Sequence, residues 1–390
     1  MQADSIVFAV FVIFSGAAVL AAAALFARQS LLIAYIVLGG LCGPAGFDVV
    51  PEPAVIQQIG HVGIIFLLYL LGLNLHPQKL IPMLRQATWV TLASSAAFAA
   101  VSAPIAWLFG YRFAEGLVVG AVMMFSSTII GLKLLPTTAL HQRHMGEVMI
   151  SVLLLQDVLA IFILLLLQGA GEAGGTDWWA MLMRLLALPL LFGFAVLMER
   201  QVLMRLIARF DVIQEYIFLT AIGWCLGMAE LAHATGLSYE IGAFIAGVAL
   251  AASPIAAFIA ESLKPLRDFF VIMFFFSVGA SFELGALGGV IVPAAVLAAA
   301  MLWFKPRVFR YLLINTGEKP RLALEIGARL GQVSEFSLLI AVLALQAGVI
   351  GAQASYLIQA ATLLTFVASS YLVVRRFPTP MALNERLRRD

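Results

Sequence analysis

The sequence predicts an all-α polytopic membrane protein with about thirteen transmembrane helices. Of its 390 residues, 63% are hydrophobic and 11% are charged, whereas soluble globular chains are about 45–50% apolar and about 25% charged. So few charges could not cover the surface of a soluble protein of this length, and the mean hydropathy of +1.04 agrees. Soluble enzymes, nucleic-acid binders and disordered proteins are therefore excluded as classes.

Apolar runs separated by charged residues or by Pro and Gly recur along the whole chain. A helix needs about 20 apolar residues to cross a bilayer. The first run follows an acidic tip without Lys or Arg, unlike the basic start of a cleaved signal peptide, so we treat it as a true span. The predicted spans, of which the second and tenth are short, are 5–27, 30–46, 54–75, 87–109, 113–135, 147–168, 178–198, 213–233, 239–260, 268–283, 288–311, 322–347 and 352–374.

The basic residues predict the orientation of these spans. With the N-terminus outside, eighteen of the 23 Lys and Arg residues fall on the inner side and only Arg112 falls outside. Such a bias is the positive-inside pattern of membrane proteins. We therefore expect a transmembrane domain over 1–375, a short basic cytoplasmic tail over 376–390, and no nucleotide-binding regulatory domain.

Neither the cysteines nor any motif predicts a cofactor site. Cys42 and Cys225 both lie in apolar runs, and two cysteines are too few for a disulfide scaffold or a four-cysteine metal site. The His and Cys spacing of a zinc site is absent, as are Gly-rich phosphate loops. We expect no cofactor, no enzymatic activity and no nucleic-acid partner.

Asp157 lies near the middle of the span 147–168, where an ionisable group costs a few kcal/mol or more. A lone carboxylate there either stays protonated or ionises when a cation binds, so a proton and a cation would compete for it. An inter-helix salt bridge is the alternative. The preceding Gln156 faces another way on a regular helix. Its amide oxygen therefore either contacts the cation where the helix is rotated or locally open, or makes an inter-helix hydrogen bond.

Three consecutive hydroxyls, on Ser126, Ser127 and Thr128, precede Gly131 and Pro136. This pattern predicts a weakened or broken helix, whose backbone and hydroxyl oxygens suit a hard monovalent cation where they line a cavity. The alternative is that the hydroxyls bond back to the preceding turn.

A second break is predicted at 328–339, seven spans later, and an odd offset inverts the topology as an inverted repeat requires. Two interrupted helices, one in each half, are typical of a transporter binding site. The polar or break-forming residues in this segment are Arg329, Gly331, Gln332, Ser334 and Glu335. Arg329 and Glu335 are six residues apart, so we expect them to serve different partners across the break.

The remaining buried or interfacial charges have less specific patterns. Lys305 is either a snorkelling lysine at the inner interface or a buried cation that balances helix-end dipoles or pairs with a carboxylate such as Asp157. Residues at the outer ends of spans are expected at the interface. They are His61, Glu230, His233 and Glu240.

Seven ordered segments resemble the membrane domain of the monovalent cation/proton antiporter-2 family, in particular the Kef-type potassium efflux proteins. They are GGLCGPAGF (39–47), GHVGIIFLLYLLGLNLHPQKL (60–80), FSSTIIGLKLL (125–135), LLLQDVLAIFILLL (153–166), GAFIAGVALAAS (242–253), FFFSVGASFEL (274–284) and LGQVSEFSLL (330–339). The resemblance implies a core bundle with two crossed broken helices and a dimerisation bundle. Departures from the family pattern are His61, Asn74 and Val333.

The resemblance also implies roles for the residues already singled out. Asp157 would bind the monovalent cation or the proton, and Gln156 stands where electrogenic sodium relatives have a second Asp, which favours electroneutral exchange. The Ser-Ser-Thr run and the segment from Gly331 to Glu335 would form the crossed breaks, and Lys305 matches the family's membrane lysine.

The function that these patterns predict is exchange of K+ or Na+ for H+ by alternating access. The expected partners are these ions, the lipid bilayer and a second copy of the chain, in the inner (cell) membrane. The alternatives are a cation channel, although there is no TVGYG-like filter, a solute symporter of related fold, and a sensor without transport.

Overall fold

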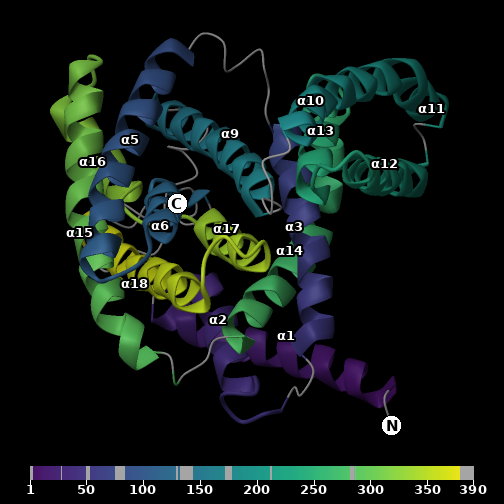
Figure 1. Ribbon diagram of the computed structural model, residues 1–390. Helices are drawn as coiled ribbons and strands as arrows, with labels where there is room; N and C mark the ends of the chain where they lie inside the picture. The colour runs from purple at the N-terminus through teal and green to yellow at the C-terminus, as the bar shows by residue number, and fades with distance from the viewer. Residues whose placement is uncertain are drawn as a thin grey trace. The chain divides into compact units, whose positions relative to one another are not determined.

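We describe a computed structural model of the protein (Figure 1). The described residues are 3–27, 29–49, 53–74, 84–128, 131, 144–171, 178–210, 213–281, 285 and 287–377. Within these ranges the regular structure is helical, and each predicted span contains a helix. The predicted tail beyond residue 377 lies outside the described residues, as does Lys133 in the fifth span.

The chain divides into two compact units, which confirms the expected division into two bundles. Unit 1 comprises residues 1–14, 38–81 and 172–281, and unit 2 comprises residues 15–37, 82–171 and 282–390. Two of the five boundaries between the units fall inside helices, one in α1 (Ala3–Phe26) and one in α2 (Leu31–Cys42).

The helices of unit 1 are α3 (Pro53–Asn74), α10 (Trp178–Met198), the π-helix η1 (Glu199–Leu203), α11 (Met204–Arg209), α12 (Gln214–Ala234), α13 (Tyr239–Ala251) and α14 (Ala256–Ala280). Those of unit 2 are α5 (Leu84–Leu108), α6 (Phe113–Met123), α9 (His144–Gly171), α15 (Leu287–Asn315), α16 (Pro320–Arg329), α17 (Glu335–Gln346) and α18 (Ala352–Arg376).

Seven of the described helical segments are long and apolar enough, by length and composition, to cross a membrane. They are Val7–Phe26, Ala87–Leu108, His144–Leu164, Leu186–Arg209, Gln214–Ala234, Gly288–Asn315 and Ala352–Arg376. Shorter apolar helices account for the second, third, fifth, ninth and twelfth predicted spans. The protein is therefore a multi-pass membrane protein, and two of its short helices, α6 and α17, end or begin at breaks in a span.

Three predicted span boundaries were wrong. The span predicted over 239–260 ends at Ala251, and the next helix begins at Ala256 rather than at 268. Of the charges in this region, Lys264 is exposed and Arg267 is half-buried and paired with the exposed Asp268, and a helix continues past charged residues that face water or a partner. The seventh span also continues through η1 to Arg209.

Unit 1 is built around α3, which packs closely against α13 and α14. The α3–α13 contact depends on glycines: a Cβ atom on Gly247 would collide with the Tyr69 carbonyl oxygen, and one on Gly72 would lie 2.5 Å from the Phe244 carbonyl oxygen. Glycine is favoured where two backbones approach this closely. The family-like segment 242–253 is thus explained by packing.

Unit 2 contains two segments with the same pattern: an unbroken helix, a broken one and another unbroken one. They are α5–α6–α9 and α15–α16/α17–α18, and the broken member is central in each, as expected of a repeat. In Figure 1, α5 runs beside α15, and α15 contacts both α5 and α16. All the candidate ion-site residues belong to unit 2.

Candidate ion-binding site at two crossed helix breaks

The first break follows α6. The helix ends at Met123, residues 125–127 have no regular structure, and helical geometry resumes at Thr128. Ser126 and Ser127 are buried, and Thr128 is partly buried. The Ser-Ser-Thr run therefore marks a true interruption, as predicted.

The second break separates α16 from α17 over residues 330–334, all of which are buried. Pro320 stands at the first position of α16, where its missing N–H has no cost. Ser334 caps α17, since its Oγ accepts a hydrogen bond from the Phe336 N–H at 3.2 Å. The predicted break position is confirmed.

The two breaks cross in direct contact. Ser126 Oγ donates to the Leu330 carbonyl oxygen at 2.8 Å, and Gln332 Nε2 donates to the Ser127 carbonyl oxygen at 3.4 Å. Ser337 Oγ also donates to the Val122 carbonyl oxygen at 2.6 Å, which ties α17 to the end of α6. Side-chain contacts thus satisfy carbonyls that helix termini leave without partners.

Lys305 is fully buried on α15 and bonds to both breaks. Its ammonium donates to the carbonyl oxygens of Phe125 at 2.6 Å, Gln332 at 3.0 Å and Met123 at 3.5 Å, and lies 5.1 Å from the centre of the Phe98 ring. Two of these carbonyls belong to the end of α6, where a positive charge complements the helix dipole. The snorkelling alternative is thereby excluded, and in the described part of the chain the partners of Lys305 are carbonyls rather than Asp157.

Gln156, on α9, forms hydrogen bonds to the backbone of the first break. Its Oε1 accepts from the Ser126 N–H at 3.0 Å, and its Nε2 donates to the Met124 carbonyl oxygen at 3.3 Å. The amide orientation follows from this pairing of donor with acceptor. The side chain therefore makes the inter-helix hydrogen bonds foreseen as one of its two alternatives, and its oxygen keeps a second lone pair.

Asp157 is buried beside the first break, with 3% of its surface exposed. Its Oδ2 lies 3.5 Å from Thr128 Oγ1, which donates to it. Glu335, at the first position of α17, interacts electrostatically with Asp157 and is also buried. The structure thus brings together a carboxylate from α9, a hydroxyl from the first break and a carboxylate from the second.

Arg329 pairs within its own helix, and the expected separation of its partners from those of Glu335 stays a prediction. Arg329, buried at the end of α16, forms an ion pair with Glu325 one turn earlier, at 2.7 Å from Nη2 and 3.1 Å from Nε. Its guanidinium also lies 5.9 Å from the centre of the Phe377 ring. This geometry indicates that Arg329 anchors the end of α16 rather than facing Asp157.

Sequence reasoning missed a row of polar side chains on α18. Thr365 Oγ1 accepts from the Val333 N–H at 3.1 Å, and Ser369 Oγ donates to Gln332 Oε1 at 3.0 Å. Ser355 and Gln359 continue the row, with Gln359 Nε2 donating to Ser355 Oγ at 3.0 Å. The signal was present in the sequence, because these residues, together with Thr362 between Gln359 and Thr365, recur every three to four positions in an otherwise apolar helix.

The polar residues near the predicted outer ends include a pair with one buried member, Glu240. In unit 1, His61 Nε2 lies 2.8 Å from Glu240 Oε1, and the Glu240 side chain is only 3% exposed. Glu240 was expected at the interface and is instead enclosed, because His61 gives it a partner. His233 stacks on Tyr239, with ring centres 4.2 Å apart.

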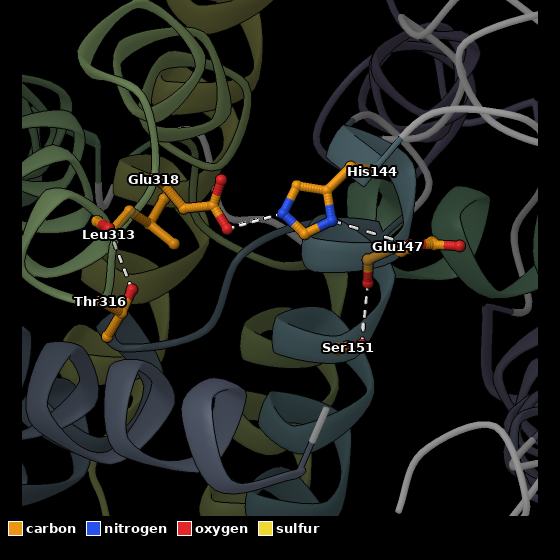
Figure 2. A network of polar contacts seen from close by, with 6 residues as sticks. All are labelled: His144, Glu147, Ser151, Leu313, Thr316 and Glu318. Carbon is orange, nitrogen blue, oxygen red and sulfur yellow. Dashed lines mark hydrogen bonds and ion pairs between the residues drawn. The ribbon is translucent and has the colours of Figure 1, made fainter. Parts of the chain in front are cut away.

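A polar cluster ties the start of α9 to the turn before α16, as Figure 2 shows. His144 Nε2 lies 2.7 Å from Glu318 Oε1, and His144 Nδ1 lies 3.8 Å from Glu147 Oε2. Ser151 Oγ donates to the Glu147 carbonyl oxygen at 2.8 Å. His144 itself is well separated along α9 from Asp157, since 13 residues of helix span about 20 Å.

These features define a helical membrane protein with two interrupted helices that cross at a buried carboxylate, an arrangement found in secondary transporters. Residues 10–374 match the family model described as sodium/hydrogen exchanger, transmembrane. The chain belongs to this family.

Individual relatives agree with the family. The chain is 29% identical over 326 residues to K(+) efflux antiporter 4 of Arabidopsis thaliana, covering 80% of this chain and 54% of that one. It is 24% identical over 367 residues to iron transporter MagA of Paramagnetospirillum magneticum, covering 93% and 84%. The chain therefore spans about half the length of the plant relative.

The fold also matches a solved structure. The sodium proton antiporter MjNhaP1 from Methanocaldococcus jannaschii aligns with a TM-score of 0.72 and 14% sequence identity, covering 95% of this chain and 96% of that one. At this identity the match establishes the fold alone.

Proposed function

We propose that the protein exchanges a monovalent cation, K+ or Na+, for a proton by alternating access. The observation that carries the proposal is Asp157, a buried carboxylate at the crossing of two interrupted helices. A carboxylate in such surroundings is stable when it is protonated or when a cation neutralises it. Binding of one ion therefore excludes the other, and this exclusion couples the two fluxes.

The ligands of the cation would come from the first break and α9. Asp157 supplies the charge, while Thr128 Oγ1 and the backbone or hydroxyl oxygens of Ser126 and Ser127 supply neutral oxygen. Gln156 would contribute the free lone pair of its amide oxygen while it holds the Ser126 N–H. Oxygen ligands of this kind suit hard cations such as Na+ and K+.

One carboxylate that carries either one cation or one proton gives electroneutral exchange. Lys305 supports this stoichiometry, because its described contacts are carbonyls and an aromatic ring rather than the Asp157 carboxylate. Unit 2, which holds all the site residues, would be the moving core, and unit 1 would form the scaffold and the contact with a second copy of the chain.

We further place the transmembrane antiporter domain at residues 1–375 and a short basic tail at 376–390. The proposed location is the inner (cell) membrane, and the Lys and Arg distribution supports an orientation with the N-terminus outside and the C-terminus in the cytoplasm. Reactivity of single cysteines introduced at either side of the membrane would test this orientation.

The test is ion exchange in proteoliposomes that contain a pH-sensitive dye. Addition of K+ or Na+ outside should move protons in wild type, and Asp157→Asn should abolish the response. The matched control is Asp268→Asn, the same substitution at an exposed carboxylate of α14, which should exchange normally. Normal exchange by Asp157→Asn would refute the assignment, and single-channel current steps in a bilayer would favour a channel instead.

A further inference from the structure

Two hydroxyls of α18 form hydrogen bonds to residues of the second break. Thr365 and Ser369 are four residues apart, so they lie on one face of the helix, and both are buried, with 0% and 2% of their surface exposed. Thr365 Oγ1 accepts from the Val333 N–H at 3.1 Å and donates to the Thr362 carbonyl oxygen at 2.8 Å. The hydroxyl is thus oriented by its own helix to receive an N–H group from the break.

Ser369 extends this contact to the first break. Its Oγ donates to Gln332 Oε1 at 3.0 Å, and the same amide donates through Nε2 to the Ser127 carbonyl oxygen at 3.4 Å. Ser127 directly precedes Thr128, whose hydroxyl donates to Asp157. A continuous set of hydrogen bonds therefore runs from α18 through the second break to the segment that faces the carboxylate.

We infer that Thr365 and Ser369 are positioning residues that set the cation affinity of the site by fixing the two breaks against each other. Neither residue touches Asp157 in the described contacts, and each acts through a break residue: Val333 in one case and Gln332 in the other. The inference rests on the proposed function, since it concerns how tightly the same site holds its cation.

The chain offers a matched control one turn away. Thr362 lies on the same helix and is 0% exposed, and its hydroxyl has no hydrogen-bond partner in the described part of the chain. Thr362→Val and Thr365→Val remove the same atom from the same helix at the same burial. They differ in that only the Thr365 hydroxyl bonds to the break.

The experiment measures the half-saturating cation concentration and the maximal exchange rate of the full chain in proteoliposomes, together with the melting temperature in detergent. Thr365→Val should raise the half-saturating K+ or Na+ concentration about five- to tenfold, the effect expected when a buried N–H loses its acceptor, with a smaller change in maximal rate. Thr362→Val should match wild type, and Thr365→Ser, which keeps the hydroxyl, should restore the affinity.

Each remaining outcome decides against the inference or against the proposed function. If Thr365→Val and Thr362→Val give the same half-saturating concentration, or if Thr365→Val loses folded protein while the remainder binds normally, the positioning role is wrong. Should Thr365→Val fail to fold, Ser369→Ala provides the second variant, and normal affinity there would refute the inference. Absence of exchange in wild type would instead refute the proposed function.

Discussion

Removal of the Lys305 ammonium tests whether this side chain holds the two crossed helix breaks together. In Lys305→Met an unbranched side chain of similar length replaces the lysine, so the packing changes little while every donor is lost. The carbonyl oxygens of Phe125 and Gln332, at 2.6 and 3.0 Å from the ammonium, would be left buried without it. Both belong to breaks whose backbone groups have no helical partner.

The magnitude follows from these two contacts. A hydrogen bond to a charged donor contributes about 1.5–3 kcal/mol, and the Met123 contact at 3.5 Å is too long to add much. The variant also avoids the cost of burying an ammonium group, and this gain offsets part of the loss. We expect the free energy of unfolding to fall by about 3 kcal/mol, and the melting temperature to fall by about 6 °C at about 2 °C per kcal/mol.

The assay is thermal unfolding of purified protein in detergent, followed by intrinsic fluorescence or by loss of the monodisperse chromatographic peak. Lys264→Met is the matched control, because this lysine is exposed on α14 and pairs with an exposed Glu261; such pairs contribute about 1 kcal/mol or less. Equal melting temperatures for the two variants would show that Lys305 does not hold the breaks.

Three further substitutions test other contacts. Gln156→Leu should lower the free energy of unfolding by about 1–3 kcal/mol, because a buried N–H of the first break loses its acceptor; an unchanged melting temperature would contradict this. Glu325→Gln should lower the melting temperature and expose α16 to protease, because it removes the charge that pairs with the buried Arg329, and wild-type proteolysis would argue against that anchor. Gly247→Ala should abolish the monodisperse peak, whereas Gly223→Ala, where a Cβ meets nothing within 4 Å, should keep it; equal behaviour would refute the close α3–α13 approach.

The sequence predicted the helical membrane fold and the two breaks because both depend on local composition. An apolar run must become a helix in a bilayer, since its backbone groups have no other partner there. Ser126 to Thr128 and Gly331 to Ser334 interrupt such runs with small or hydroxyl-bearing residues, and the structure breaks the helices at both places.

Pairings across helices could not be predicted in the same way. The sequence left open whether Lys305 met Asp157, a carbonyl or the interface, because spacing along the chain does not specify which side chains meet across 180 residues. The α13–α14 boundary was wrong for a related reason: charges such as Glu261 and Asp268 end an apolar run without ending a helix.

Both breaks depend on hydrogen bonds from the unbroken helices around them. Lys305 on α15, Gln156 on α9 and Thr365 on α18 each bond to backbone groups of a break. Asp157 differs, because its described hydrogen bond is a long one from the Thr128 side chain. Loss of the carboxylate therefore removes no backbone partner. For this reason Asp157→Asn should fold normally and fail to exchange. Lys305→Met removes two backbone partners, and its main effect should be a loss of stability.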